Sequence, residues 1–143
     1  MKNLIFLSLF FALPCFAAKK KKDFLIATEL NYKTPQTTAH SKSENILEGD
    51  DFDSWQPLNQ AENGVVLLGR MISEKENYLQ FEFMIVDTNQ KPIFLDGGVG
   101  MEDLSGAESV IRHSRKDKSG NPLFSSEIKV SIKKVDHKEK KQE

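Results

Sequence analysis

Four carboxylates, Glu48, Asp50, Asp51 and Asp53, form the densest group of side chains that could bind a metal ion. Calcium takes about six to eight oxygen ligands, so this group is a candidate calcium site. The spacing differs from that of an EF-hand, which alternates acidic positions around a glycine and ends on a distal glutamate. We therefore expect a solvated acidic loop, and keep calcium or ligand binding by residues 48–53 as an alternative function.

Three glycines, Gly97, Gly98 and Gly100, have a spacing that could begin a phosphate-binding loop. The dinucleotide-binding fingerprint needs another glycine three residues after the second one, and a helix that opens behind it. Asp103 occupies that place. We therefore expect flexible turn glycines between strands, with Gly98 and Gly100 as candidates for contact with a partner.

The residues typical of catalytic and metal sites are scattered. His40, His113 and His137 lack the close spacing of zinc or copper ligands. A G-x-S-x-G nucleophile motif is absent from the sequence. Glu82 and Glu127 could face each other as paired carboxylates, but their strand positions place them more readily on solvent-facing sides. The sequence predicts neither an enzyme nor a cofactor.

Two aromatic residues beside the acidic group are candidates for protein contacts. Phe52 and Trp55 belong to the acidic, irregular segment 46–55, and Trp55 is the only tryptophan. Tryptophan is enriched at interface hot spots, so Trp55 could anchor a partner. It could also tie the segment to the core, and this second interpretation is the one that we favour.

The first seventeen residues have the pattern of a secretory signal peptide. Lys2 precedes the apolar run 4–13, and small residues precede a cleavage point after Ala17. The run is half the length of a membrane span. Pro14 stands before Cys15 where lipoprotein signals usually have Gly, Ala or Ser, which argues against a lipid anchor at Cys15.

The chain after the predicted cleavage site is almost neutral and has no cysteine. Only Lys2 of the 20 basic residues, and none of the 21 acidic ones, lies within 1–17. This balance points to neither nucleic acid nor a membrane surface as the partner. The single cysteine is Cys15, so the exported chain needs no disulfide. No later stretch is apolar enough to span a bilayer.

Alternating apolar residues predict strands separated by turns. Tyr78–Val86 alternates with Leu79, Phe81, Phe83 and Ile85 on one side. The other predicted strands are 24–30, the strongly apolar run 65–72, 91–95, 107–114 and the long alternating segment 123–135. The segment 31–45 is polar and reads as a long loop. Short turns between strands favour an antiparallel sheet.

These elements predict an all-β domain, a small antiparallel β-sandwich or partly open barrel of about six or seven strands. The expected organisation is a signal peptide at 1–17, a basic disordered lead-in at 18–22 and one β-rich domain at 23–136, of which 31–63 is rich in loops. The charged end at 137–143 is expected to be disordered.

A pattern within residues 83–135 resembles the hairpins of secretin domains and of some short exported β-proteins. The matching pieces are Lys91-Pro92-Ile93-Phe94, then Ser105-Gly106-Ala107-Glu108-Ser109-Val110, then Glu127-Ile128-Lys129-Val130-Ser131-Ile132. The chain is too short for the repeated periplasmic domains of a secretin. The resemblance implies a β-domain that pairs its strands with envelope proteins, and it transfers no functional residue.

The sequence thus favours a periplasmic or secreted, non-enzymatic module that contacts another envelope or secreted protein through a sheet edge or a loop. The first alternative is the ligand- or calcium-binding protein described above. A further alternative is an inhibitor that inserts a loop, 96–100 or 115–122, into the cleft of a secreted enzyme.

Overall fold

The computed structural model describes residues 22–89 and 94–136. The predicted signal peptide, the charged end 137–143 and all of the basic lead-in except Lys22 lie outside the described residues. Among the residues that are described, no helical segment is long and apolar enough to cross a lipid bilayer.

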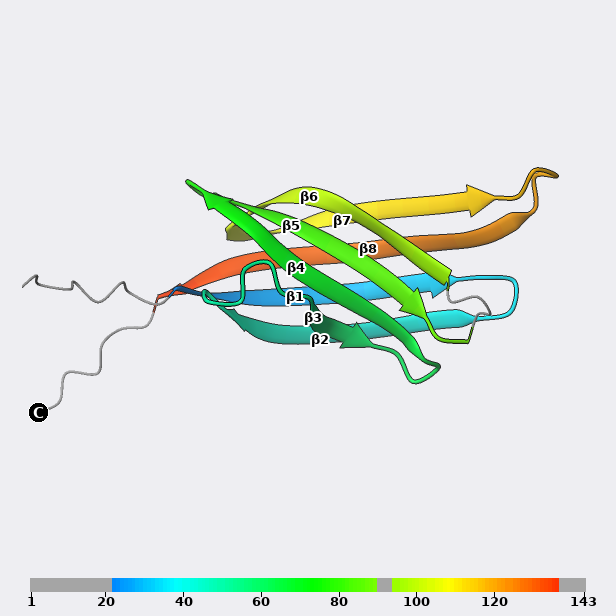
Figure 1. The fold of residues 1–143 in the computed structure, drawn as a ribbon, viewed down its shortest axis with the longest axis horizontal. Helices are drawn as coiled ribbons and strands as arrows, with labels where there is room; N and C mark the ends of the chain where they lie inside the picture. The colour runs from blue at the N-terminus through cyan, green and yellow to red at the C-terminus, as the bar shows by residue number, and fades with distance from the viewer. Residues whose placement is uncertain (1–21, 90–93, 137–143) are drawn as a thin grey trace, which may run out of the picture.

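Eight antiparallel strands form two packed sheets (Figure 1). One sheet has the order β2-β1-β8-β7 and the other the order β3-β4-β5-β6. The strands are β1 (Lys22–Lys33), β2 (Thr38–Glu48), β3 (Gln56–Gln60), β4 (Val65–Lys75), β5 (Tyr78–Asp87), β6 (Phe94–Asp103), β7 (Ser105–Lys116) and β8 (Pro122–Asp136). The predicted all-β sandwich is confirmed, with eight strands where six or seven were expected.

The chain passes from strand to strand in sequence order around the sandwich. Strands β3 to β6 form a meander, and β1 pairs with β8, so that Lys22 lies opposite Asp136. Between β2 and β3, and between β6 and β7, no backbone ladder joins the two sheets in the described chain. These two seams keep the molecule a sandwich rather than a closed barrel, and they leave β2, β3, β6 and β7 as sheet edges.

The core lies between the sheets and consists of the alternating side chains that face inward. Tyr78–Val86 and the segment 123–135 are strands, and in each the alternate side chains that the sequence predicts to face the core are buried. Burial of this apolar surface is the main favourable term in folding. The largest fully buried side chains are Tyr32, Phe24, Phe81, Ile26, Leu30, Leu58, Leu67, Met71, Leu79, Ile85, Ile128 and Ile132.

The polar segment 31–45 is not the long loop that the sequence predicted. Strand β1 continues to Lys33, the chain turns over four residues, and β2 begins at Thr38. The Thr34 hydroxyl accepts the backbone N–H of Thr37 at 2.9 Å and closes this turn. The prediction failed because most inward positions of β2 carry small polar residues, so that no apolar alternation marks the strand.

The glycine-rich segment 97–100 is also a strand rather than a turn. It lies in the middle of β6, where Gly98 pairs with Phe83 of β5. A Cβ at Gly98 would lie 3.1 Å from the Phe83 ring and 3.3 Å from His113. The glycine therefore permits a close approach of β6 to the sheet opposite, a role that glycine serves within strands.

Candidate interaction surface

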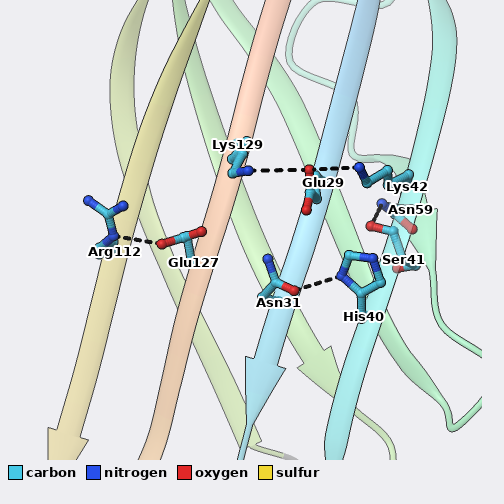
Figure 2. Close-up of polar contacts among 9 residues, drawn as sticks. All are labelled: Glu29, Asn31, His40, Ser41, Lys42, Asn59, Arg112, Glu127 and Lys129. Atoms are coloured by element: carbon cyan, nitrogen blue, oxygen red, sulfur yellow. Dashed lines mark hydrogen bonds and ion pairs between the residues drawn. The ribbon is translucent and has the colours of Figure 1, made fainter.

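The outer face of the β2-β1-β8-β7 sheet carries rows of charged side chains that form ion pairs with one another (Figure 2). Glu29 on β1 lies between Lys42 on β2, at 3.2 Å, and Lys129 on β8, at 3.5 Å. The hydrogen bond from Lys42 is the largest influence that lowers the pKa of Glu29, and Lys129 adds to it. Exposed ion pairs of this kind contribute little to stability.

A second polar row crosses the same face at the next outward position of each strand (Figure 2). The His40 ring nitrogen lies 2.6 Å from the Asn31 side-chain oxygen, and Arg112 donates to Glu127 at 2.6 Å. These residues line a shallow groove of about 530 Å³. Because its side chains are paired within the face, the groove has the character of a solvated surface.

The outer face of the β3-β4-β5-β6 sheet has the opposite character. Its outward positions on β4 and β5 are half-buried and largely apolar, namely Val66, Leu68, Ile72, Met84 and Val86. Of the apolar run 65–68, only Val65 and Leu67 face the core. Much of the outer side of this sheet therefore presents apolar surface that the other sheet does not cover.

Strand β6 completes this face with its most exposed apolar side chains. Leu95, Val99 and Met101 point outward and are 55%, 57% and 58% exposed. Soluble proteins rarely leave contiguous apolar patches open unless the patch binds something. We call the outward row Leu95, Gly97, Val99 and Met101 the β6 row.

A polar and aromatic row crosses the same face from β3 toward β6. The Arg70 guanidinium lies 4.9 Å from the centre of the Trp55 ring and donates to Glu82 at 3.0 Å. Glu82 is the cross-strand neighbour of Val99. Trp55 is 36% exposed and lies at the border of the apolar face, so the favoured interpretation that it ties its segment to the core is wrong; Phe52 makes that contact instead.

Glu82 and Glu127 do not face each other, contrary to the possibility of paired carboxylates. Glu82 lies on β5 and Glu127 on β8, in different sheets. Each makes an ion pair with an arginine of the neighbouring strand, Arg70 or Arg112. Both occupy outward positions, as expected, and their partners are arginines rather than lysines.

A buried carboxylate on the inner side of β6 collects polar groups from the other sheet. Asp96 accepts a hydrogen bond from the Ser126 hydroxyl at 2.7 Å, and its second oxygen lies 3.0 Å from Nδ1 of His113. Sequence reasoning missed this group because its members come from β6, β7 and β8. A catalytic triad places histidine between serine and the carboxylate. Here the carboxylate is in the middle, so the arrangement suits a structural bridge.

Tyr32 lies fully buried near this carboxylate. Burial raises its pKa to about 12, and the negative charges of Asp87 and Asp96 act in the same direction. The hydroxyl has no hydrogen-bond partner within the described part of the chain. This end of the sandwich therefore combines buried acids with a hydroxyl that must stay neutral.

The acidic segment forms a compact turn after β2. The Asp51 carboxylate accepts the backbone N–H of Glu48 at 3.2 Å, and Asp53 has a positive φ of 63°. Asp53 donates its own N–H to the Met71 carbonyl at 2.8 Å. Over the described residues, no group of three or more metal-ligating side chains comes together. The four carboxylates thus occupy a turn whose geometry is set by hydrogen bonds within the protein.

The remaining candidate residues from the sequence lie in different places. Phe52 packs edge-on against Phe24 of the core, with ring centres 6.2 Å apart. Gly98 and Gly100 lie on the inward side of β6. The predicted inhibitory loop 96–100 is part of a strand, and the loop 115–122 is a hairpin turn over residues 117–121. The sequence signal that marks the apolar face is the continuous run 65–68, because its side chains are apolar at the outward as well as the inward positions of the strand.

The chain matches no family model, no curated protein and no solved structure in the comparisons made. The resemblance of residues 83–135 to secretin hairpins therefore stays a prediction. Function has to be argued from the surface itself.

Proposed function

We propose that this protein is an exported, non-enzymatic β-sandwich of the bacterial envelope that binds another protein chain through its β3-β4-β5-β6 sheet. The observation that carries the proposal is the β6 row, where three large apolar side chains stand more than half exposed on an edge strand. Covering apolar surface is worth roughly 25 cal/mol per Å², so a partner that covers this face gains affinity directly.

The contrast between the two outer faces supports this choice. Central charges on the β2-β1-β8-β7 face are paired with one another, as with Glu29 between Lys42 and Lys129. The exposed apolar side chains on the opposite face are not covered by other parts of the described chain. Interface cores are poor in charged residues and rich in aromatic residues and methionine. Met84, Met101 and Trp55 fit that composition.

The non-enzymatic part of the proposal is supported by the order of groups around Asp96. Ser126 donates to the carboxylate rather than to His113, so no base is placed to activate its hydroxyl. Export is proposed on the strength of residues 1–17 alone, whose basic, apolar and small-residue order directs a chain to the Sec pathway.

Site-specific photo-cross-linking in the producing cells tests the proposal. A photoreactive residue at Gln80, an outward position of β5 opposite Met101, reports on the apolar face. The same residue at Ser131, on the outer face of β8, is the matched control. We expect specific cross-linked bands in the envelope fraction from position 80 and none from position 131. Bands from 131 alone, or from neither position, would overturn the proposal.

A further inference from the structure

Strand β6 is the sheet edge whose outward side chains are uncharged from Leu95 to Met101. It pairs with β5 alone, so its far side offers unpaired backbone N–H and C=O groups. Side chains bridge both seams: the Asn59 amide of β3 donates to the Ser41 carbonyl of β2 at 3.1 Å, and the Ser126 hydroxyl of β8 donates to Asp96 of β6 at 2.7 Å. Edge strands that must stay single usually carry outward charges. Strand β7 does so with Glu108 and Arg112, whereas the outward positions of β6 carry a charge only at the last residue, Asp103.

We propose that the free edge of β6 pairs antiparallel with β6 of a second copy of this chain, which joins two four-stranded sheets into one of eight strands. This inference rests on the proposed function, because it names the partner of the same face. A second copy fits since the β6 row is uncharged and complementary to itself.

The register follows from three constraints on a twofold axis. Opposite residues in a ladder must point to the same face, so the sum of their numbers has to be even. Pairing nearly all of 94–103 leaves an axis at Gly98, which pairs 94–102, or at Val99, which pairs 95–103. An axis at Val99 would set Asp96 opposite Glu102 of the second copy, which is a like-charge pair. An axis at Gly98 avoids this and is the register that we infer.

In that register the large side chains of the β6 row meet complementary positions. Leu95 lies opposite Met101 of the second copy, and Val99 lies opposite Gly97 of the second copy. The glycine leaves room for the valine, and the same contacts repeat across the axis. On the inner side, Asp96 lies opposite Gly100 of the second copy, so its bridge to Ser126 remains undisturbed.

Oligomeric state is the first measurement. We expect a dimer by light scattering at concentrations up to about 100 µM, well above a micromolar Kd. Val99→Lys should give a monomer, because its new charge would sit in the interface while facing Glu82 within its own sheet. The control Val110→Glu places a charge on the outer face of β7 beside Lys129 and should stay dimeric. A monomeric wild type, or a Val99→Lys variant that remains dimeric, would overturn the inference.

Disulfide trapping tests the register even if a variant fails to fold. In a Cys15→Ser background the double variant Leu95→Cys, Met101→Cys should form a covalent dimer under mild oxidation. Within one chain the two positions are about 20 Å apart along the strand, too far for an internal bond. Each single variant should stay uncross-linked, because its one cysteine would lie opposite Leu95 or Met101 of the second copy and not opposite another cysteine. Cross-linking by the singles as strongly as by the double would contradict the register.

The two proposals can fail separately. A monomeric protein that still cross-links to another protein from position 80 would leave the proposed function standing and remove the dimer. The absence of any band from position 80, in a protein that is also monomeric, would remove both.

Discussion

The Asp96 carboxylate accepts a hydrogen bond from the Ser126 hydroxyl at 2.7 Å and so connects β6 of one sheet to β8 of the other. The bond crosses the interior beside a seam where no backbone ladder runs in the described chain. Asp96 also lies 3.0 Å from His113 of β7, and its side chain is only 8% exposed. A single carboxylate therefore ties β6 to two strands of the opposite sheet.

Asp96→Ala should lower the free energy of unfolding by about 1.5–3 kcal/mol, since a buried, charge-assisted bond is lost and the Ser126 hydroxyl is left unpaired. Ser126→Ala should cost less, because Asp96 keeps His113. Urea unfolding measures both, with Ser125→Ala at the exposed neighbouring position as control. If Asp96→Ala is as stable as the wild type, the bridge has no energetic importance.

Tyr32 should make the protein sensitive to alkaline pH. Its folded pKa is raised to about 12 from an ordinary value of 10.0, so above about pH 10 the unfolded chain loses the Tyr32 proton more readily than the folded one. The free energy of unfolding should therefore fall by about 1–2 kcal/mol, after allowance for solvent screening, as the pH rises toward 12. Tyr32→Phe should lose less stability over this window in urea unfolding measured at several pH values.

The same variant has a second expected effect at neutral pH. The Tyr32 hydroxyl is buried without a partner in the described residues, so its removal should leave stability unchanged or raise it. Tyr78→Phe, at a position that is 47% exposed, is the control for removal of a hydroxyl. A clear loss of stability in Tyr32→Phe at pH 7 would show that the hydroxyl is bonded in solution.

Gly69 should tolerate no side chain. A Cβ at this position of β4 would overlap the Phe81 ring and the Leu58 side chain, both of which are buried in the core. Gly69→Ala should cost about 1–3 kcal/mol, the usual range for overpacking. At Gly100 an added Cβ would have a single close neighbour, the Glu102 carboxylate at 3.1 Å. Gly100→Ala should therefore be the milder change in thermal unfolding, and equal losses would argue against the packing explanation.

The fold could be predicted from the sequence where inward positions are apolar. Strand β8 alternates Ile128, Val130 and Ile132 with polar residues, and this alternation shows which of its side chains face the core. Strand β2 was missed because Ser41 and Ser43 face inward and are held by the ladder to β1, a long-range interaction that local patterning does not contain. Tertiary pairing of this kind commonly overrides weak strand propensity.

The interaction surface was harder to predict than the fold. The glycines of β6 have low strand propensity, so the β6 row was hidden inside an expected turn. The exposure of Val99 and Met101 also depends on which face of the sheet the other sheet covers, and alternation alone does not decide this. The Asp96 bridge needs three strands to assemble, so no spacing in the sequence could reveal it.

Glu74 should make stability depend on acid pH at the end of β4. It accepts a hydrogen bond from Lys134 at 2.6 Å and lies 3.4 Å from Lys22, so it joins its sheet to β8 and β1. The bond from Lys134 is the main cause of the lowered pKa of Glu74. The stability from this carboxylate is present above about pH 4.5 and is lost as the pH falls through the lowered folded pKa.

Glu74→Gln should be less stable than the wild type by about 1 kcal/mol at pH 7, because a half-exposed ion pair is lost. The difference should shrink toward zero as the pH falls below about 4.5 and through the lowered folded pKa of Glu74, where the wild-type carboxyl becomes protonated. Urea unfolding across this range, with Glu62→Gln in the β3–β4 turn as control, measures the gap. A gap that stays constant as the pH falls would mean that the charge of Glu74 is not the source of its stabilising effect.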